Sequence, residues 1–360
     1  MIKQTCSRRL ILSGVILLFG LFFSCSRDNS QSEPSKSNVT LNGAGATFTY
    51  PLYSRWTGTY QKLTGVSINY QSIGSGAGIA QIKVGTVDFG ASDAPLRKET
   101  LEAQGLIQFP MIVGGITPVV HLNGIGAGDL RLTPEILAGI YLGHIKKWND
   151  AEILRVNPGI TLPDIPIVPI HRVDGSGTTW IFTNYLSKIS PEWNEKVGNA
   201  IAISWPTGAG GKGNEGVSAY IQRINGAIGY VAFVYAVQNK FAYVKLQNQA
   251  GKFVEPGPES FEAAMSNADW ANSAEFFVVL TNQPGSDTWP IIGPSFILLR
   301  KNWEESQDIK ILLDFFDWCY HRGPELAAQL NYVALPQNVI EMVEDQWKKQ
   351  IRVNGEPVWQ

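Results

Sequence analysis

The stretch IPIVPIHRVDGSGTTWIFTNYL, residues 165–186, contains the pattern that decides the fold. Its apolar start, 165–170, predicts a buried strand, and the segment 178–186 predicts a helix. Between them lie Gly175 and Gly177, which permit a tight turn and a close approach of the backbone to another group. A short strand that leads through a glycine turn into a helix is the repeating unit of α/β proteins.

Two earlier stretches repeat this pattern. GAGATF, residues 43–48, leads into a helix expected over 48–62, and GSGAG, residues 74–78, follows an alternating strand at 66–70. Further strands are expected at 87–91 and 107–120, and further helices from the cap Thr133-Pro134 and around 339–347. Strands alternating with helices predict an α/β fold with mainly parallel sheets.

The overall charge excludes one class of function. The 360 residues carry a net charge of −2, so the chain lacks the basic footprint of a nucleic-acid-binding protein. Lys3, Arg8 and Arg9 are the only charges before residue 25, and without these three the charge is about −5. An acidic chain of this kind needs a local site if it is to bind an anion.

The first 24 residues predict an export signal. A basic start precedes an apolar run, 10–23, which is too short to span a bilayer comfortably. The run ends in Ser24-Cys25, which resembles a bacterial lipobox, although Phe22 stands where that motif prefers leucine. Three outcomes are open: lipidation of Cys25, ordinary cleavage near Ser24, or a retained anchor. We expect the first, with 1–24 removed as a signal peptide.

The segment after the signal predicts a tether. Residues 25–38 comprise the lipidated Cys25 and a polar linker with almost no apolar side chains. Once Cys6 has left with the signal, Cys319 is the only other cysteine, so we expect it to be a buried structural thiol without a disulfide.

The three glycine turns predict an oxyanion site. Free N–H groups and the positive end of the dipole meet at a helix N-terminus, and each turn adds a serine or threonine hydroxyl. The alternative is that all three are ordinary helix caps. A nucleotide-binding enzyme is not indicated, because the glycine-rich loop 208–213 lacks the Walker spacing and has no serine or threonine after its lysine.

At these residues the chain resembles a known family. GAGATF, SIGSGAG, VDFGASDAP, RVDGSGT, GGKGN and GAIGYV follow one another, from about residue 41 onward, as in the periplasmic phosphate-binding proteins of bacterial ABC importers. The resemblance implies a two-lobed, type II-like periplasmic-binding-protein fold with its ligand cleft between the lobes. Lobe I is expected to comprise 39–117 plus 291–360, and lobe II to comprise 118–290.

The resemblance also implies a set of phosphate ligands. The expected donors are the hydroxyl and N–H groups of the three turns and one guanidinium, beside one acceptor. They are Thr47, Phe48 through its N–H, Ser75, Arg172 with Asp174 orienting it, Ser176, Gly177, Thr178, and the acceptor Asp93.

A carboxylate in an anion site has a chemical rationale. Asp93 accepts hydrogen bonds only, and hydrogen phosphate carries an O–H that can donate to it. Sulfate has no such proton at neutral pH, so its oxygens would face the carboxylate without compensation. Arsenate carries the same proton as phosphate, so this argument does not exclude a receptor for arsenate. The alternative for Asp93 is a turn or capping residue.

We expect a binding protein and not an enzyme, without cofactor or metal. The four histidines, at 121, 144, 171 and 321, show no ligand spacing, and no nucleophile elbow is present. The expected partners are phosphate, the transmembrane subunits of an ABC permease and, through the lipid, a membrane. The expected state is a monomer anchored on the periplasmic or cell-surface side. A secreted phosphatase and a phosphate-binding surface adhesin or sensor are the alternatives.

Overall fold

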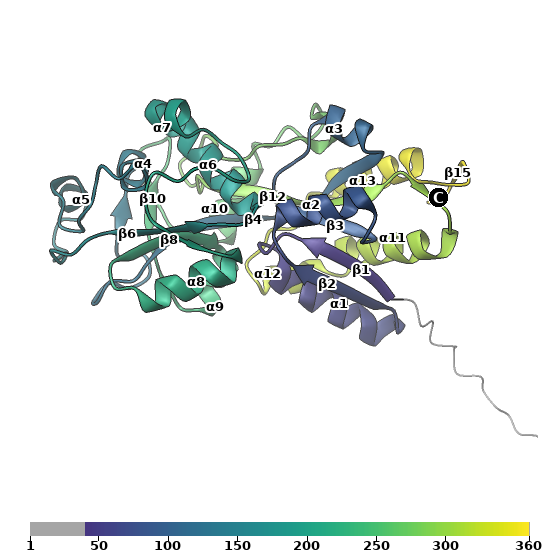
Figure 1. The fold of residues 1–360 in the computed structure, drawn as a ribbon, viewed down its shortest axis with the longest axis horizontal. Helices are drawn as coiled ribbons and strands as arrows, with labels where there is room; N and C mark the ends of the chain where they lie inside the picture. Colours follow the sequence, from purple (N-terminus) through teal and green to yellow (C-terminus); the bar gives the residue numbers. More distant parts are fainter. Residues whose placement is uncertain (1–39, 360) are drawn as a thin grey trace, which may run out of the picture. The chain divides into compact units, whose positions relative to one another are not determined.

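The computed structural model describes residues 40–359 (Figure 1). The predicted signal peptide, Cys25 and the linker lie outside the described residues. Within 40–359, none of the helices combines the length and the apolar character that a membrane span requires.

The strand β4 (Leu106–Val120) organises the sheet. All of its 15 residues are buried, because the run LIQFPMIVGGITPVV contains almost no polar side chains. Its first part, up to Gly115, pairs antiparallel with β12 (Ile292–Arg300), and from Ile116 onward it pairs antiparallel with β8 (Ala227–Ala232). One strand therefore belongs to both halves of the sheet.

The nine-stranded sheet has the order β2-β1-β3-β12-β4-β8-β6-β7, with β9 also paired to β4. Its remaining strands are β1 (Thr40–Gly45), β2 (Ser67–Ser72), β3 (Phe89–Ser92), β6 (Val168–Arg172), β7 (Ala209–Gly211) and β9 (Ala242–Tyr243). We call β1, β2, β3, β12 and residues 106–115 of β4 the first half, and β6, β7, β8, β9 and residues 116–120 the second half.

The sheet is more mixed than the sequence indicated. Pairing is parallel between β1 and its neighbours β2 and β3, and between β6 and its neighbours β7 and β8. Every pair that involves β4 or β12 is antiparallel, because these two strands carry the chain in opposite directions between the halves. The predicted α/β class is confirmed.

Helices accompany both halves. Those connected to the first half are α1 (Tyr50–Thr64), α2 (Ser75–Val84), α3 (Lys98–Ala103), α11 (Ser306–His321), α12 (Pro324–Ala328) and α13 (Gln337–Gln350). Those connected to the second half are α4 (Pro134–Leu142), α5 (Ala151–Val156), α6 (Gly177–Ile189), α7 (Pro191–Lys196), α8 (Gly213–Arg223), α9 (Phe233–Gln238), α10 (Pro258–Met265) and the 3-10 turn Ala274–Phe276.

Two small sheets complete the described part of the chain. One joins β5 (Arg131–Leu132), β10 (Lys245–Gln247) and β11 (Phe253–Val254), and the other joins β13 (Asn302–Trp303), β14 (Arg352–Val353) and β15 (Glu356–Pro357).

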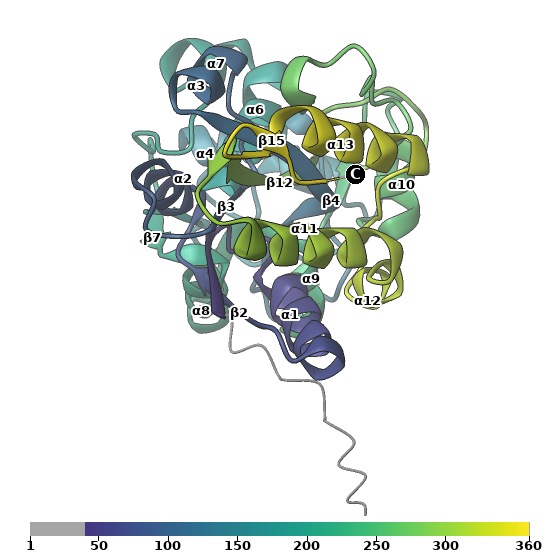
Figure 2. The same cartoon turned by 90° about the vertical axis from the view of Figure 1, so that its right-hand side faces the viewer.

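Aromatic side chains fill one face of the first half. The ring of Phe109 on β4 packs against Phe316 of α11 and Trp347 of α13, and Phe316 also meets Phe89 of β3. Figure 2 shows the molecule from the side that carries α11 and α13. Burying such a ring stabilises the fold by roughly 1.5–3 kcal/mol. Cys319, on the same helix as Phe316, is buried and free, as predicted.

Short sequence patterns predicted the bounds of most helices and strands to within a few residues. Thr133 caps α4 as expected, because its hydroxyl accepts from the N–H of Ile136 at 3.3 Å. The helix expected from residue 48 begins at Tyr50, which leaves Thr47 and Phe48 in the turn before it. The strand expected at 165–170 begins at Val168, since residues 165–167 hydrogen-bond to segment 146–148 instead.

Candidate anion-binding site

Four helix N-termini meet beside the carboxyl ends of the strands. The helices α1 and α2 follow β1 and β2 in the first half, and α6 and α8 follow β6 and β7 in the second. The first N–H groups of a helix have no partner within it, and the helix dipole places partial positive charge there. The topology thus gathers four anion-attracting ends, where the sequence had indicated three.

Residues of the two halves contact one another directly at this site. The N–H of Gly177 donates to Ser75 Oγ at 3.0 Å, and the N–H of Gly76 donates to the carbonyl of Gly175 at 2.9 Å. These approaches need glycine: a Cβ on Gly177 would lie 2.6 Å from Asp93 Cβ and 2.7 Å from Ser75 Oγ. The described conformation is therefore one in which the halves are closed on each other.

Arg172 is buried and held by Asp174. Its side chain is 2% exposed, and its Nε and Nη2 both donate to the Asp174 carboxylate. Burial alone would raise the pKa of Asp174, but the Arg172 guanidinium and the N–H of Gly213 outweigh it and hold that pKa below its ordinary value. The predicted orienting role of Asp174 is consistent with this geometry. Nε and Nη2 of the guanidinium bind Asp174, so Nη1 remains available to another group.

Several donors at the site lack an acceptor. Within residues 40–359, Arg172 Nη1 is buried without a hydrogen-bond partner. Over the same range, the backbone N–H groups of Thr47, Phe48 and Thr178 donate to no described residue. Buried donors of this kind cost about 1–3 kcal/mol each when unpaired. Their clustering points to a ligand that accepts hydrogen bonds.

Among residues 40–359, Asp93 is the one fully buried carboxylate, and it lies beside Ser75 and Gly177. It is 1% exposed, its Oδ1 accepts from Ser295 Oγ at 2.8 Å, and its N–H donates to Ser75 Oγ at 3.3 Å. Burial raises its pKa to about 7, against the lowering effects of Ser295, Arg172 and Ser75. From the sequence, Asp93 was expected to accept hydrogen bonds only, which holds for its ionised form. In this environment both protonation states are present near neutral pH.

Asn214 and Tyr235 join the site, and the sequence argument did not select them. Asn214 Nδ2 donates to Thr47 Oγ1 at 2.7 Å, across the two halves, and Tyr235 Oη donates to the Thr47 carbonyl at 2.7 Å. Asn214 ends the GGKGN motif at the start of α8, so a fourth glycine turn was a visible signal.

Two further side chains of this region, Ser176 and His171, make contacts within the second half. The Ser176 hydroxyl accepts from the N–H of Thr179 at 3.0 Å and therefore caps α6. The ring of His171 stacks on Trp205 with centroids 4.8 Å apart. Burial lowers the pKa of His171, so at neutral pH it adds little positive charge to the site.

The described residues contain one group of three possible metal ligands, away from these turns: Asp317, His321 and Glu344 on α11 and α13. His321 Nε2 lies 2.9 Å from Glu344 Oε1 and 3.5 Å from Asp317 Oδ1. The i, i+4 spacing of Asp317 and His321 was readable in the sequence, where only the spacing among histidines was considered.

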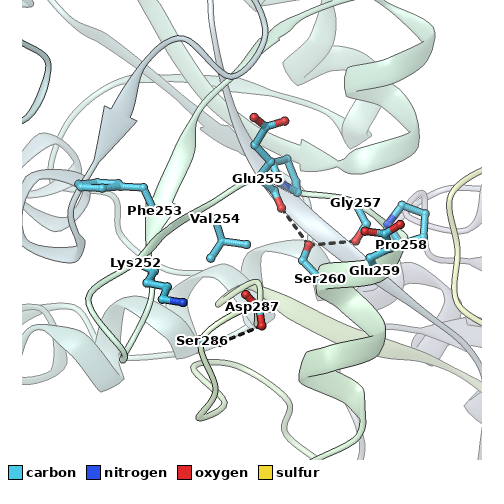
Figure 3. Close-up of a pocket in the computed structure, with 11 residues that line it drawn as sticks. Lys252, Phe253, Val254, Glu255, Gly257, Pro258, Glu259, Ser260, Ser286 and Asp287 are labelled. Carbon is cyan, nitrogen blue, oxygen red and sulfur yellow. Dashed lines mark hydrogen bonds between the residues drawn. The ribbon is translucent and has the colours of Figure 1, made fainter.

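A separate surface pocket of about 630 Å³ lies between β11 and α10 (Figure 3). Its charged lining residues are Lys252 and three acids, Glu255, Glu259 and Asp287. Ser260 Oγ donates to the carbonyls of Glu255 and Gly257, so this hydroxyl is already engaged. An excess of carboxylates without converging N–H groups makes the pocket unsuited to an anion.

Comparison with known proteins assigns the class first. The profile of the PBP superfamily domain matches residues 30–322, and the chain therefore belongs to that superfamily. Structures with a similar fold include PfluDING, a high-affinity periplasmic phosphate-binding protein bound with phosphate, with a TM-score of 0.70 at 20% identity. That match covers 86% of this chain and 94% of the other. An ABC-type phosphate transport receptor from Vibrio cholerae matches with a TM-score of 0.53 at 17% identity, over 82% and 100% of the two chains.

Closer relatives then identify the family. The chain is 52% identical over 327 residues to the phosphate-binding protein PstS of Xylella fastidiosa strain Temecula1, covering 90% of each chain. It is 49% identical over 345 residues to the phosphate-binding protein PstS of Pasteurella multocida, covering 96% of this chain and 98% of that one. The chain belongs to the PstS family of phosphate-binding proteins.

Proposed function

We propose that this protein binds inorganic phosphate, as hydrogen phosphate, and delivers it to an ABC-type import permease. The observation that carries the proposal is the cluster of unpaired donors beside a single buried carboxyl group. Arg172 Nη1 and the N–H groups of Thr47, Phe48 and Thr178 supply donors from both halves. Asp93 supplies the acceptor that a protonated oxyanion requires.

Phosphate is favoured over other oxyanions because of that acceptor. Hydrogen phosphate donates its O–H to ionised Asp93, and its other oxygens can accept from the donors of the site. Sulfate offers no proton, so it is bound only by the form in which Asp93 itself is protonated. Arsenate shares the proton of phosphate and is expected to compete.

Capture follows from ligands on both halves. Thr47, Ser75 and Asp93 belong to the first half, and Arg172 and the start of α6 belong to the second. Phosphate therefore stabilises the closed conformation over an open one, and a permease can distinguish the two. The lobes are 39–117 plus 291–360, and 118–290. The change of partner along β4, after Gly115, supports this division.

The proposal includes a location and a membrane tether. Cys25 follows the signal segment and receives the lipid, the polar residues 26–38 form the linker, and the binding domain is a monomer on the periplasmic or cell-surface side. Replacing Cys25 with serine is expected to release the protein from the membrane fraction. Membrane retention of this variant, with the signal segment uncleaved, would favour the retained anchor.

The protein acts without catalysis in this proposal. Thr178 and Ser75 carry hydroxyls at the site, and neither has a histidine or lysine base among its hydrogen-bond partners within residues 40–359. A secreted phosphatase would hydrolyse phosphate esters, so an ester assay separates that alternative from a receptor. A phosphate-binding adhesin or sensor would bind phosphate but would not restore uptake in cells that lack their own receptor.

Titration calorimetry on residues 26–360, stripped of ligand, tests the proposal. We expect tight one-to-one binding of phosphate and far weaker binding of sulfate at pH 8. A folded, stripped protein that does not bind phosphate would overturn the proposal. Equal binding of sulfate at pH 8 would reduce it to a general anion receptor and remove the role given to Asp93.

A further inference from the structure

A set of buried hydroxyl groups lies behind the carboxyl group of Asp93. Ser295 is fully buried, and its Oγ donates to Asp93 Oδ1 at 2.8 Å. Tyr53 Oη and Thr49 Oγ1 are also buried, and neither has a hydrogen-bond partner within residues 40–359. Burial raises the pKa of Tyr53, and the side chains of Thr49, Ser295 and Asp93 also affect it, so these groups form one polar layer.

The backbone aims Ser295 at this carboxyl group through an irregularity in β12. The pairing of β12 with β4 shifts its register between Ser295 and Phe296: Ser295 lies opposite Ile112, whereas Phe296 lies opposite Pro110. A bulge of this kind redirects a side chain relative to a regular strand. Phe296 then pairs with Ser92, the residue before Asp93, which brings Ser295 next to the carboxyl group.

The hydrogen bond from Ser295 makes the two oxygens of Asp93 different. Oδ1 is occupied by the Ser295 hydroxyl, and within residues 40–359 no donor reaches Oδ2. We infer that Ser295 is a positioning and specificity-determining residue, whose hydroxyl fixes the Asp93 carboxyl group so that one oxygen alone accepts the proton of the ligand. This inference rests on the proposed phosphate-binding function and adds a residue to it.

The remaining neighbours of Asp93 do not replace this hydroxyl. Arg172 and Ser75 favour the ionised carboxylate, but Arg172 is directed to Asp174 and Ser75 Oγ accepts from backbone N–H groups. The tyrosines that face Asp93 keep neutral rings, because burial raises the pKa of each; they are Tyr53, Tyr70 and Tyr332. Within the described residues, Ser295 makes the direct hydrogen bond to an oxygen of this carboxyl group, and the Ser75 side chain has a smaller lowering effect on the pKa of Asp93.

The variant Ser295→Ala tests the inference. It leaves Oδ1 buried without a donor, which disfavours the ionised carboxylate and frees its rotation. We expect phosphate affinity to fall roughly 10- to 100-fold, and sulfate binding to persist to higher pH than in the unsubstituted protein. A loss of packing alone would not move the pH midpoint of sulfate binding. Ser295→Thr keeps the hydroxyl and is expected to restore both properties.

The matched control is Ser218→Ala on α8, which removes a buried hydroxyl outside the site that has no partner within residues 40–359. Thermal unfolding of each variant checks that it folds. If the unsubstituted protein binds phosphate and Ser295→Ala keeps its affinity and its sulfate profile, the role of Ser295 is refuted while the proposed function stands. If the unsubstituted protein fails to bind phosphate, the function itself fails.

Discussion

The close contact at Gly177 gives a quantitative test of closure. In Gly177→Ala, the new Cβ would lie 2.6 Å from Asp93 Cβ and 2.7 Å from both Asp93 N and Ser75 Oγ. Carbon atoms in ordinary contact are about 3.5–4.0 Å apart, so the halves must separate by about 1 Å. That separation would lengthen the bond from Gly177 N–H to Ser75 Oγ from 3.0 Å to about 4 Å, which breaks it.

The loss of affinity follows from the bonds that separation removes. One neutral hydrogen bond contributes about 0.5–1.5 kcal/mol, and one bond to a charged ligand about 1.5–3 kcal/mol. Together they amount to about 2–4 kcal/mol, or a roughly 30- to 1,000-fold weaker binding of phosphate. Titration calorimetry with phosphate measures this directly. The backbone of Gly177 does not require glycine for its φ angle, so the fold is expected to remain intact.

Gly58→Ala is the control for this experiment. Gly58 lies inside α1, and a Cβ there would have no atom within 4 Å. Alanine is expected to stabilise the helix by about 0.5–1 kcal/mol and to leave phosphate affinity unchanged. If folded Gly177→Ala bound phosphate within threefold of the unsubstituted protein, the closed conformation described here would not be the one that binds.

Three further predictions concern the acceptor and its partners. Because the pKa of Asp93 is about 7, sulfate affinity should fall roughly tenfold from pH 6 to pH 8 as the carboxyl group ionises; a flat profile by calorimetry would contradict this. The pKa of Asp93 is raised from 3.8 to about 7 in the folded state, so ionising this carboxyl group destabilises the fold. The contribution of Asp93 to the free energy of unfolding is fully present below about pH 4 and is lost as the pH rises through 7. Asp93→Asn should therefore raise the unfolding free energy of ligand-free protein at pH 8 by up to about 4 kcal/mol while admitting sulfate, and no gain in denaturant titrations would refute the sign. Asn214→Ala removes the bond to Thr47 across the halves and should weaken phosphate binding roughly 10- to 100-fold, which an unchanged dissociation constant would exclude.

The sequence allowed the donors of the site to be predicted because their signals are local. A glycine turn between a strand and a helix is visible within a few residues, and three such turns predicted an oxyanion site. The choice of Thr47, Ser75 and Arg172 as ligands came from the family resemblance. The structure brings these residues together, as strand order in an α/β sheet requires. Asp174 was predicted only to orient Arg172. The sequence separation of two residues does not determine that Nε and Nη2 of the guanidinium are the nitrogens that bind Asp174.

Two contributors could not be selected from the sequence in this way. Asn214 acts on Thr47 through a contact that spans 167 residues, so only the assembled halves reveal it. Ser295 lies in an apolar strand, where a single serine predicts nothing in particular, and its direction depends on a register shift. The raised pKa of Asp93 likewise results from burial by segments distant in the chain, because no neighbouring residue in ASDAP determines it.

The position of β12 determines at what point during synthesis and export the binding site can be completed. β12 lies between β3 and β4 in the sheet, yet Ser295 is separated by 202 residues from the carboxyl group to which it donates. A nascent or partly exported chain that ends before β12 has Asp93 without its donor, and β3 has its neighbour β1 on one side only. Long-range pairing of this kind forms late and slowly. The acceptor of the site is therefore completed only when nearly the whole chain has emerged, and an unfinished molecule cannot compete for the ligand.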